Sequence, residues 1–528
     1  MKTKSNYLLL STLIGGLLFN YLFWMEDLGL NLLFYSIFVI AITVFNDEVI
    51  KSTKFKIYAA AHLFAAILVV IINSDLSIIA YFFSFIFFVG YSHYQSIRSI
   101  YAAFLAAIMQ FITIPFSLLK RLSEVKIGNY NFKPIIRPIK YIVLPLFIVF
   151  VFTMIYSGAN KVFGHYLEVT FVNIGDFFYN TFGFIFKDLS FDRFMHLCFG
   201  ILVTGGLLIT FYSNVIGKIE SYFNENLSRK RRDKRSTSIW NEVINTFFGQ
   251  LINKKLALKT EYIIGFISFA ALNLLLLCLN GIDIWWLWLG KGRNLAEVNY
   301  SADLHDGTNA LIFSIVLAMA VILYFFRGNL NFYYKNKTLK ALAFAWMIQN
   351  FILIISVFIR DGYYIEFYGL THKRIGVLVF ALLCIIGLAT VYLKVNRQKT
   401  LFYLFKVNGN IWFALLLVFS SINWDVFIAR YNLTQSSKTS IDADFLLSLS
   451  NKTLPVLDKY RAKLHYTPSE APYQTEIAKP QTADFYQKRL DERIDSFRER
   501  YESLNWLSLS FQDWNTAEYF GLNKTINK

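Results

Sequence analysis

Hydrophobic residues along most of this chain come in blocks of about 16–22 residues, a length that matches the roughly 30 Å hydrocarbon thickness of a bilayer at about 1.5 Å rise per residue. Lipid offers no water to pair with backbone N–H and C=O groups, so each block is expected to form a helix. The last block is expected to begin nearer Phe402 than its apolar core suggests. The pattern predicts these candidate membrane spans: Tyr7–Trp24, Leu28–Phe45, Ile57–Ile72, Leu76–Tyr91, Ile100–Leu118, Tyr141–Ser157, Phe194–Tyr212, Tyr262–Leu279, Asp306–Phe326, Ala341–Ile359, Ile375–Leu393 and Ile411–Ile422.

The composition supports the same interpretation. The chain is 56% hydrophobic and 16% charged, whereas soluble chains are about a quarter charged. We therefore predict an all-α fold, a polytopic transmembrane helical bundle of about 11–12 spans with a small, mostly helical extramembrane module at the C-terminus. Cys198, Cys278 and Cys384 lie in or beside apolar blocks without disulfide or zinc spacing, so we expect them to be buried apolar residues.

The net charge of +17 belongs to the membrane part, because residues 423–528 carry 14 Lys and Arg against 14 Asp and Glu. Basic residues between apolar blocks are typical of cytoplasmic loops, so we expect no nucleic-acid partner. The same rule puts the N-terminus, with Lys2 and Lys4, inside and the C-terminal tail outside. It assigns these segments to the cytoplasm: Lys120–Lys140, Arg229–Arg235, Arg327–Lys340 and Lys394–Lys406.

One of the first five candidate spans conflicts with this orientation. Five crossings before Lys120 would reverse the sidedness of all later loops. We predict that Ile100–Leu118 does not cross, because it contains Gln110 and Pro115 and follows Arg98. It is expected to be re-entrant or to lie in the interface, which leaves eleven crossings.

Two further stretches are amphipathic without being candidate spans. Ile239–Ile252 repeats its apolar residues every four positions, which predicts a helix lying in the plane of the cytoplasmic leaflet. We expect the neighbouring Arg229–Arg235 run to bind anionic lipids. Val162–Phe186 is apolar, but a crossing there would move Arg229–Arg235 outside, so we interpret it as an interfacial element on the outer face.

The tail differs from the rest of the chain. Asp442 is placed to cap a short helix that is broken or bent at Pro455. The stretch Asp484–Leu504 predicts a charged helix with one apolar stripe, which is too short for an independent coiled coil and is expected to dock on the rest of the tail. The stripe consists of Leu490, Ile494, Phe497, Tyr501 and Leu504.

These features divide the chain into five parts. Residues 1–119 hold the N-terminal transmembrane helices, and residues 120–213 hold a basic loop, a span, the outer interfacial segment and a second span. Residues 214–261 form the basic cytoplasmic loop with its in-plane helix. Residues 262–422 form a transmembrane bundle, and residues 423–528 form the extramembrane module.

Four motifs stand in order in the second half of the chain: Ser301–Ile312, Tyr324–Phe332, Tyr368–Gly376 and Asn423–Asn432. Together they resemble the bacterial membrane families called domain of unknown function 4153 and 4173, which are common in Bacteroidota. The similarity covers roughly Leu256 to Pro455. The resemblance implies a bacterial inner-membrane protein, so the outer side to which the charge pattern assigns the tail is expected to be the periplasm. It implies no activity and no catalytic residue.

Charged side chains gather at the outer ends of the predicted spans. A functional site there would take a substrate or a proton, with Arg360 and Arg374 holding an anionic headgroup. A structural cluster would instead consist of ion pairs that fasten helix ends and the tail. We predict that Asp303, His305 and Asp306 lie within side-chain reach of an arginine, and we predict no metal and no cofactor. The candidate cluster consists of Asp303, His305, Asp306, Arg360, Asp361, Glu366, His372, Arg374, Asp425 and Arg430.

Three functional hypotheses stay open. The first is a non-enzymatic envelope protein whose bundle anchors and positions an exported tail that contacts an envelope-protein partner. The second is a transporter or lipid-handling protein with a polar site at the outer face. The third is a membrane enzyme acting on a lipid-linked substrate. A polar cavity reaching the midplane would favour transport, a groove with a carboxylate–His pair would favour an enzyme, and a solidly packed bundle would favour the anchor.

Overall fold

The protein is helical almost throughout the part of the chain that its computed structural model describes. The described residues are 2–46, 49, 51–94, 97–124, 126–127, 130–131, 149, 152–154, 156–157, 161–182, 190–209, 215–228, 258–289, 300–435, 441–464 and 482–522. Within them the strands are β1 (Lys126–Ile127) and β2 (Tyr130–Asn131), which form a small antiparallel pair. The predicted all-α fold is confirmed.

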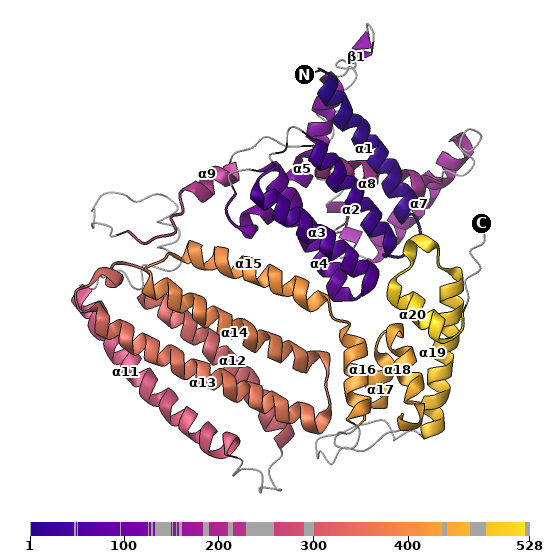
Figure 1. Cartoon of the computed structure of the whole chain (residues 1–528). Helices are drawn as coiled ribbons and strands as arrows, with labels where there is room; N and C mark the ends of the chain where they lie inside the picture. Colours follow the sequence, from indigo (N-terminus) through magenta and orange to yellow (C-terminus); the bar gives the residue numbers. More distant parts are fainter. Residues whose placement is uncertain are drawn as a thin grey trace. The chain divides into compact units, whose positions relative to one another are not determined.

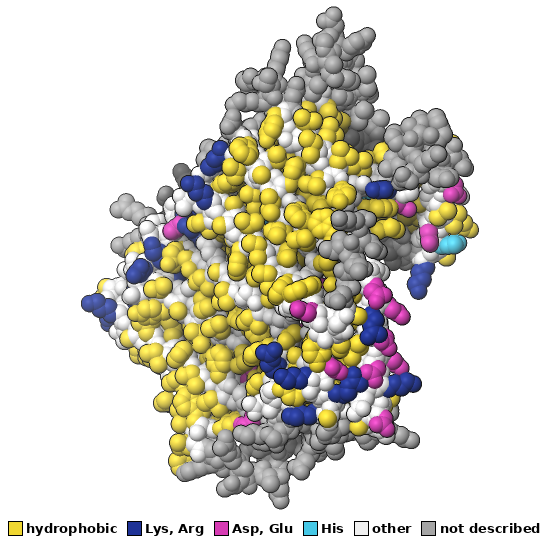
Figure 2. Space-filling model, turned by 45° about the vertical axis from the view of Figure 1, so that its right-hand side comes forward, with side chains coloured by type: hydrophobic (Ala, Val, Ile, Leu, Met, Phe, Trp, Pro, Cys, Tyr) yellow, Lys and Arg dark blue, Asp and Glu magenta, His cyan; other side chains and the backbone are white. Residues whose placement is uncertain are grey.

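Eight helices among the described residues are long and apolar enough to cross a membrane. Three more helices carry shorter apolar stretches: α1 (Lys2–Phe23), α2 (Leu30–Phe45) and α12 (Tyr300–Phe325). Large hydrophobic side chains cover much of the exposed surface, as the broad yellow area of Figure 2 shows, and this is the surface that a membrane helix presents to lipid. The eight are α3 (Thr53–Ile71), α4 (Asp75–His93), α5 (Ile100–Glu124), α8 (Phe191–Leu208), α11 (Leu258–Asp283), α13 (Asn336–Tyr368), α14 (His372–Asn396) and α15 (Leu401–Ser420).

The predicted spans coincide with helices wherever they fall on described residues. α15 begins at Leu401, close to the start near Phe402 that we expected. Most of the predicted span Tyr141–Ser157 lies outside the described residues, as do the basic run Arg229–Arg235 and the in-plane helix Ile239–Ile252.

The boundary of α13 differs from the prediction. This helix continues to Tyr368, well beyond the predicted end at Ile359. It ends at Gly369, whose φ of 75° lies in the left-handed region that favours glycine. Arg360, Asp361 and Glu366 therefore belong to the helix and not to a loop that follows it.

By its internal contacts the chain forms two compact units, and each is described by itself. Unit 1 comprises Met1–Tyr222, Leu415–Asn423 and Phe497–Lys528. Unit 2 comprises Phe223–Ala414 and Trp424–Ser496. Residues of the C-terminal tail therefore occur in both units.

In unit 1, α1 packs closely against α8 at glycine positions (Figure 1). A Cβ atom at Gly15 would collide with the side chain of Thr204, and one at Gly200 would collide with that of Phe19. Small residues at such a crossing let two helix backbones approach, which is a common way for membrane helices to associate. The Tyr35 and Thr204 hydroxyls, 2.9 Å apart, join α2 to α8.

The ends of α2, α4 and α8 meet at one end of unit 1, which we call the basic end. The Asn46 side chain, just after α2, donates to the Leu208 carbonyl at 3.2 Å, and Nε2 of His93 in α4 hydrogen-bonds to the Leu207 carbonyl at 2.7 Å. The side chain of Lys54, near the start of α3, donates to the Ile97 carbonyl between α4 and α5. Basic residues of the helix ends here are Lys51, Lys54, Lys56 and Arg98. The opposite, acidic end carries Glu26, Asp27, Asp75, Asp192 and Arg193.

Helix α5 is unbroken at Pro115, so the re-entrant form of our prediction for this stretch is wrong. Several of its contacts along four turns nevertheless lie near the basic end. Ala103 lies against Gly90 in the last turn of α4, and Gln110 donates to the carbonyl of Ile209, which directly follows α8. Ile114 packs on Ile209 in the same apolar cluster. This packing supports an interfacial α5, although the length and hydropathy of the helix suffice for a crossing.

The stretch that we expected at the outer interface forms one helix, α7 (Lys161–Phe182). It does not reach the hydropathy of the candidate spans in the described part of the chain. Many of its large apolar side chains are exposed, including Val162, Tyr166 and Phe177. Its place at the interface stays a prediction.

In unit 2, α11 and α13 run parallel and side by side (Figure 1). The Asn273 side chain donates a hydrogen bond to the Leu342 carbonyl. Two turns further along both helices, the Asn280 side chain donates to the Gln349 carbonyl. The shared core consists of apolar side chains from α11, α12, α13 and α14 around Phe269. Parallel neighbours leave the ends of α11 and α13 at the same end of the unit, together with the start of α14.

The tail forms short helices. α16 (Trp424–Thr434), α17 (Ala443–Ser448) and α18 (Leu454–Lys459) precede α19 (Ala483–Ser503) and α20 (Phe511–Tyr519). Asp442 caps α17 by accepting from the Phe445 N–H at 2.9 Å, as predicted. Pro455 lies in the first turn of α18, so the break comes before it. The apolar stripe of α19 is buried from Leu490 to Tyr501.

We predict that both ends of α5 lie on one side of the membrane. With Cys198, Cys278 and Cys384 replaced, Ser123→Cys and Lys51→Cys should react with an impermeant thiol reagent from the same side. Met25→Cys at the acidic end should react from the opposite side, since Met25 is exposed in the α1–α2 loop. Reaction of the Ser123 variant from the Met25 side would show that α5 crosses.

Candidate functional site

A seam of polar side chains runs between α11 and α13 in unit 2. The Gln349 amide donates to the Asn273 side-chain oxygen at 2.8 Å, and Asn280 donates to the Gln349 carbonyl at 3.0 Å. Asn280 is 3% exposed. In lipid such groups need partners within the protein, and each hydrogen bond between helices also fixes their register.

The seam ends in an ion pair. Arg360 of α13 contacts Asp283, the last residue of α11, at 2.5 Å, and the two side chains are 21% and 5% exposed. Beyond Asp283 the backbone forms a single π-helical turn, Ile284–Trp288. That turn brings the Trp288 indole N–H to the Ser356 hydroxyl at 3.1 Å. Asp283 is thus the counterion that Arg360 needs near the hydrocarbon boundary.

Arg374 lies in the first turn of α14 and closes the turn between α13 and α14. It donates to the Tyr368 carbonyl at 2.8 Å and to the Gly369 carbonyl, and its guanidinium lies 4.3 Å from the centre of the Tyr364 ring. The carboxylate of Asp361, one turn before Tyr364, is buried and attracts the Arg374 charge. The arginine therefore caps the carbonyl end of α13 and compensates one buried acid.

Helix α16 is fastened to this turn by two contacts. Asn432 accepts from the Leu370 N–H at 2.6 Å and donates to the Leu370 carbonyl at 2.9 Å, so one amide satisfies both backbone groups of a buried residue. Asp425 hydrogen-bonds to Nε2 of His372 at 2.8 Å and accepts from the Ser450 N–H at 3.1 Å. The two contacts hold both ends of α16.

The environment of Asp425 favours its charged form. Burial alone would raise the pKa of this carboxyl group. The hydrogen bonds from His372 and Ser450 and the charge of His372 outweigh burial and lower the pKa to about 2. Asp425 is therefore a carboxylate at every physiological pH.

The predicted cluster is distributed over three small groups of side chains. Arg360 pairs with Asp283, Arg374 faces Asp361, and His372 meets Asp425. Glu366 and Arg430 are exposed. Asp303, His305 and Asp306 lie in the first turns of α12, but their side chains lie outside the described residues, so their pairing with arginine stays a prediction.

Sequence reasoning did not single out Asp283, Asn432 or Ser450 as parts of the site. A signal existed for Asp283, because Asp283 and Arg360 both stand at the outer ends of predicted spans. Asn432 and Ser450 carry no charge and gave no such signal. Across the residues that the structure describes, no three His, Cys, Asp or Glu side chains are grouped to hold a metal ion.

Four acceptors at this end of unit 2 lack a hydrogen-bond partner among the described residues. They are Oδ1 of Asn280, Oδ2 of Asp283, Oε1 of Gln349 and Oδ2 of Asp361. Buried acceptors without partners are costly and are commonly satisfied by water or by a bound ion. The α11–α13 seam therefore has unused capacity to accept hydrogen bonds.

Fold and composition together define a multi-pass α-helical membrane protein. Residues 58–460 match the family described as Domain of unknown function (DUF4153), and the chain belongs to that family. The resemblance to family 4153 is thus confirmed, and the match begins well before Leu256, where we had placed its start. No curated protein and no solved structure matches the chain.

We predict that Asp425→Asn destabilises the protein and that the loss depends on pH. A pKa near 2 in place of 3.8 corresponds to about 2 kcal/mol, which the half-exposed His372 reduces to about 1 kcal/mol. The pKa is lowered on folding, so this stability is present above pH 4 and is lost as the pH falls toward 2. Melting temperatures in detergent should differ at pH 6 and converge toward pH 2. The exposed Glu366→Gln should show no such difference, and an equal gap at both pH values would contradict the assignment.

Proposed function

We propose that this protein resides in a bacterial inner membrane and that its helical bundle anchors and positions the C-terminal module on the outer side. The observation that carries the proposal is the junction of α16 with the α13–α14 turn. There the charged and polar side chains of the candidate site bind one another and the backbone. Such use of polar groups supports a fastening role.

The interior of the module supports a preformed structure. Arg493 of α19 donates to the carbonyls of Leu447 and Leu449, at 2.6 and 2.7 Å, and to the side chain of Asn451 at 2.9 Å. These carbonyls stand at the C-terminal end of α17, where no helical N–H is available to them. One arginine thus joins α19 to the last turn of α17 and to the segment that follows it.

Two further contacts join α19 to the rest of the module. Tyr486 donates to Asp444 at 3.0 Å, and Arg461 contacts Asp491 at 2.7 Å. Burial and the Asp444 carboxylate raise the pKa of Tyr486 to about 12, so this hydroxyl keeps its proton at physiological pH. A module held in this way presents a fixed surface, which suits contact with an envelope-protein partner.

The distribution of charge supports the orientation. In unit 1 the basic end carries Lys51, Lys54 and Arg98, whereas the opposite end carries acidic residues. In unit 2 the starts of α13 and α15 are basic, with Lys337, Lys340 and Lys406. Basic residues favour the cytoplasmic side in both units, which supports a tail on the outer side. We also propose that the Arg229–Arg235 run binds anionic lipids of the inner leaflet. The thiol-labelling experiment on α5 tests the orientation as well, because reagent added outside should reach Met25→Cys.

We predict that Arg493→Met loosens the module and leaves the bundle intact. The variant loses three hydrogen bonds and leaves two backbone carbonyls without their partner. Hydrogen exchange in α17 and α18 should become faster by about tenfold, the factor that corresponds to roughly 1.4 kcal/mol, while α11 and α13 stay unchanged. Lys488→Met, at an exposed position of the same helix, is the matched control. Unchanged exchange in α17 and α18 would remove the support for a fastened module.

One observation favours a second function, the passage of protons or small cations. The α11–α13 seam reaches from Asp283 at the helix end to Asn273, about three turns inside. Three of its buried acceptors lack partners among the described residues. Polar side chains at such depth line pathways in many membrane proteins. The seam would form the outer part of such a path.

We predict for this second function that liposomes containing the wild-type protein and a pH-sensitive dye conduct protons faster than protein-free liposomes. Asp283→Asn and Gln349→Leu should return the rate to that of the protein-free control, because both remove seam acceptors. Thr390→Val removes a hydrogen bond to Asn408 between α14 and α15 and should keep the wild-type rate. A wild-type rate equal to that of empty liposomes would exclude the path.

The observation relevant to the third hypothesis, a membrane enzyme, is the His372–Asp425 pair. A carboxylate that holds an imidazole is a common part of acid–base sites. Here the second oxygen of Asp425 takes the Ser450 N–H, and the pair joins α14 to α16. This placement fits the junction better than it fits a site open to substrate.

A further inference from the structure

The last described segment of unit 1 carries an exposed aromatic surface. It consists of Trp506 in the 3-10 turn Trp506–Ser508 together with Phe511, Trp514 and Tyr519 of α20. Each of the four side chains is between 47% and 51% exposed. Glu518 and Asn515 lie between them on the same face. We call these four residues the aromatic face.

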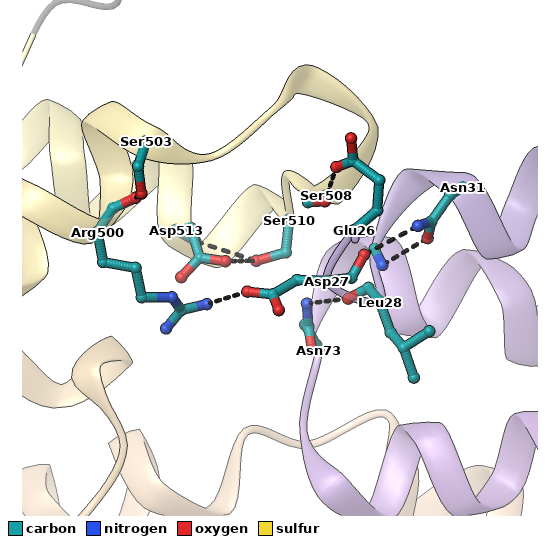
Figure 3. Close-up of polar contacts among 11 residues, drawn as sticks. Glu26, Asp27, Leu28, Asn31, Asn73, Arg500, Ser503, Ser508, Ser510 and Asp513 are labelled. Carbon is teal, nitrogen blue, oxygen red and sulfur yellow. Dashed lines mark hydrogen bonds and ion pairs between the residues drawn. The ribbon is translucent and has the colours of Figure 1, made fainter. Parts of the chain in front are cut away.

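The other face of α20 is buried within unit 1. Asp513, Thr516 and Ala517 are at most 3% exposed. The Ser510 hydroxyl caps the helix by accepting from the Asp513 N–H at 3.2 Å and donates to the Asp513 carboxylate at 2.6 Å (Figure 3). The helix is therefore fixed in rotation, and the aromatic face points away from the protein because its opposite side is packed.

Polar contacts hold this segment to the loop between α1 and α2, at the acidic end of unit 1. Glu26 accepts from the Ser508 hydroxyl at 2.5 Å, and Asp27 pairs with Arg500 at 3.4 Å (Figure 3). Glu26 also accepts from the Asn505 amide at 2.6 Å. Gly29 lies directly against the Ser508 carbonyl, where a Cβ atom would collide. The segment thus covers the end of a helical hairpin.

The position of Trp506 gives the depth of the aromatic face. Its ring makes an edge contact with Phe34 of α2, with 6.0 Å between ring centres. Phe34 stands four residues after the start of α2, roughly 6 Å along the helix axis, and is itself exposed on the lateral surface. α20 also touches α3, whose end carries the exposed Ile71. The aromatic face is therefore continuous with the lipid-facing surface of α2 and α3.

We propose that the aromatic face lies in the headgroup region of the membrane leaflet at the acidic end of unit 1, with glycerophospholipids as its partner. Tryptophan and tyrosine concentrate at this depth because they join an apolar ring to a polar N–H or O–H group. An interfacial helix of this kind also accommodates Glu518 and Asn515, whose polar groups reach the water layer. Under the orientation proposed above the leaflet is the outer one, so the end of the tail is bound to the membrane surface.

The test measures the surroundings of single labelled positions in the full chain. Trp514→Cys and Phe511→Cys, made in a background without native cysteines, each receive an environment-sensitive NBD label. Glu499→Cys, at an exposed position of α19, is the matched control. The proteins are inserted in phospholipid nanodiscs, which expose both faces to water, so that the result does not depend on the orientation of the tail. Melting temperatures confirm that each variant folds.

The proposal predicts opposite quenching at the two kinds of position. Lipids brominated on the acyl chain should quench the labels at positions 511 and 514 several-fold more strongly than the label at position 499, and aqueous iodide should show the reverse order. Equal access of iodide to all three positions would show that the aromatic face is solvated. Protection of positions 511 and 514 from both quenchers would mean that protein covers the face. Either result would overturn the proposal.

Discussion

The absence of water between the two surfaces of the bilayer is the constraint on which the rest of this structure depends. A polar group in a span must find its partner on a neighbouring helix or on a free carbonyl. Lys394 is almost completely buried and donates to the Phe326 carbonyl at the end of α12, and Gln349 and Asn280 link α13 to α11. These contacts determine which helices are neighbours in unit 2, and the neighbours determine which charged residues meet at the helix ends.

At the end of unit 2 where α13 stops, the same constraint produces a junction. Helix ends leave carbonyls and N–H groups unpaired, and Arg374 and Asn432 supply side chains to two of these positions. Asn432 belongs to α16. The hydrogen bonds that satisfy the backbone of the α13–α14 turn are therefore the same ones that attach the tail to it. The polar side chains of the candidate site are thus required, before any other role, to pair the backbone groups that the end of α13 leaves unpaired near lipid.

The sequence predicted much of the fold because block length and capping are local properties. The start of α15, the Asp442 cap and the buried stripe of α19 all follow from residues within one or two turns. The partners in the candidate site were harder to predict, since they depend on lateral packing. Helices α11 and α12 follow one another in the sequence, but the ion pair between Asp283 and Arg360 joins α11 to α13. The extension of α13 also escaped prediction, because Arg360 and Asp361 look like residues of a loop until their counterions are known.

Helix α13 is 33 residues long, which corresponds to roughly 50 Å and exceeds the about 30 Å of a hydrocarbon core. Such a helix must tilt or project from the bilayer. The turn after its far end is bound to α16 through Leu370, so the direction of α13 bears directly on the position of α16. Under the orientation proposed above, a thinner or thicker membrane would change the tilt of α13, and with it the height of α16 above the lipid surface.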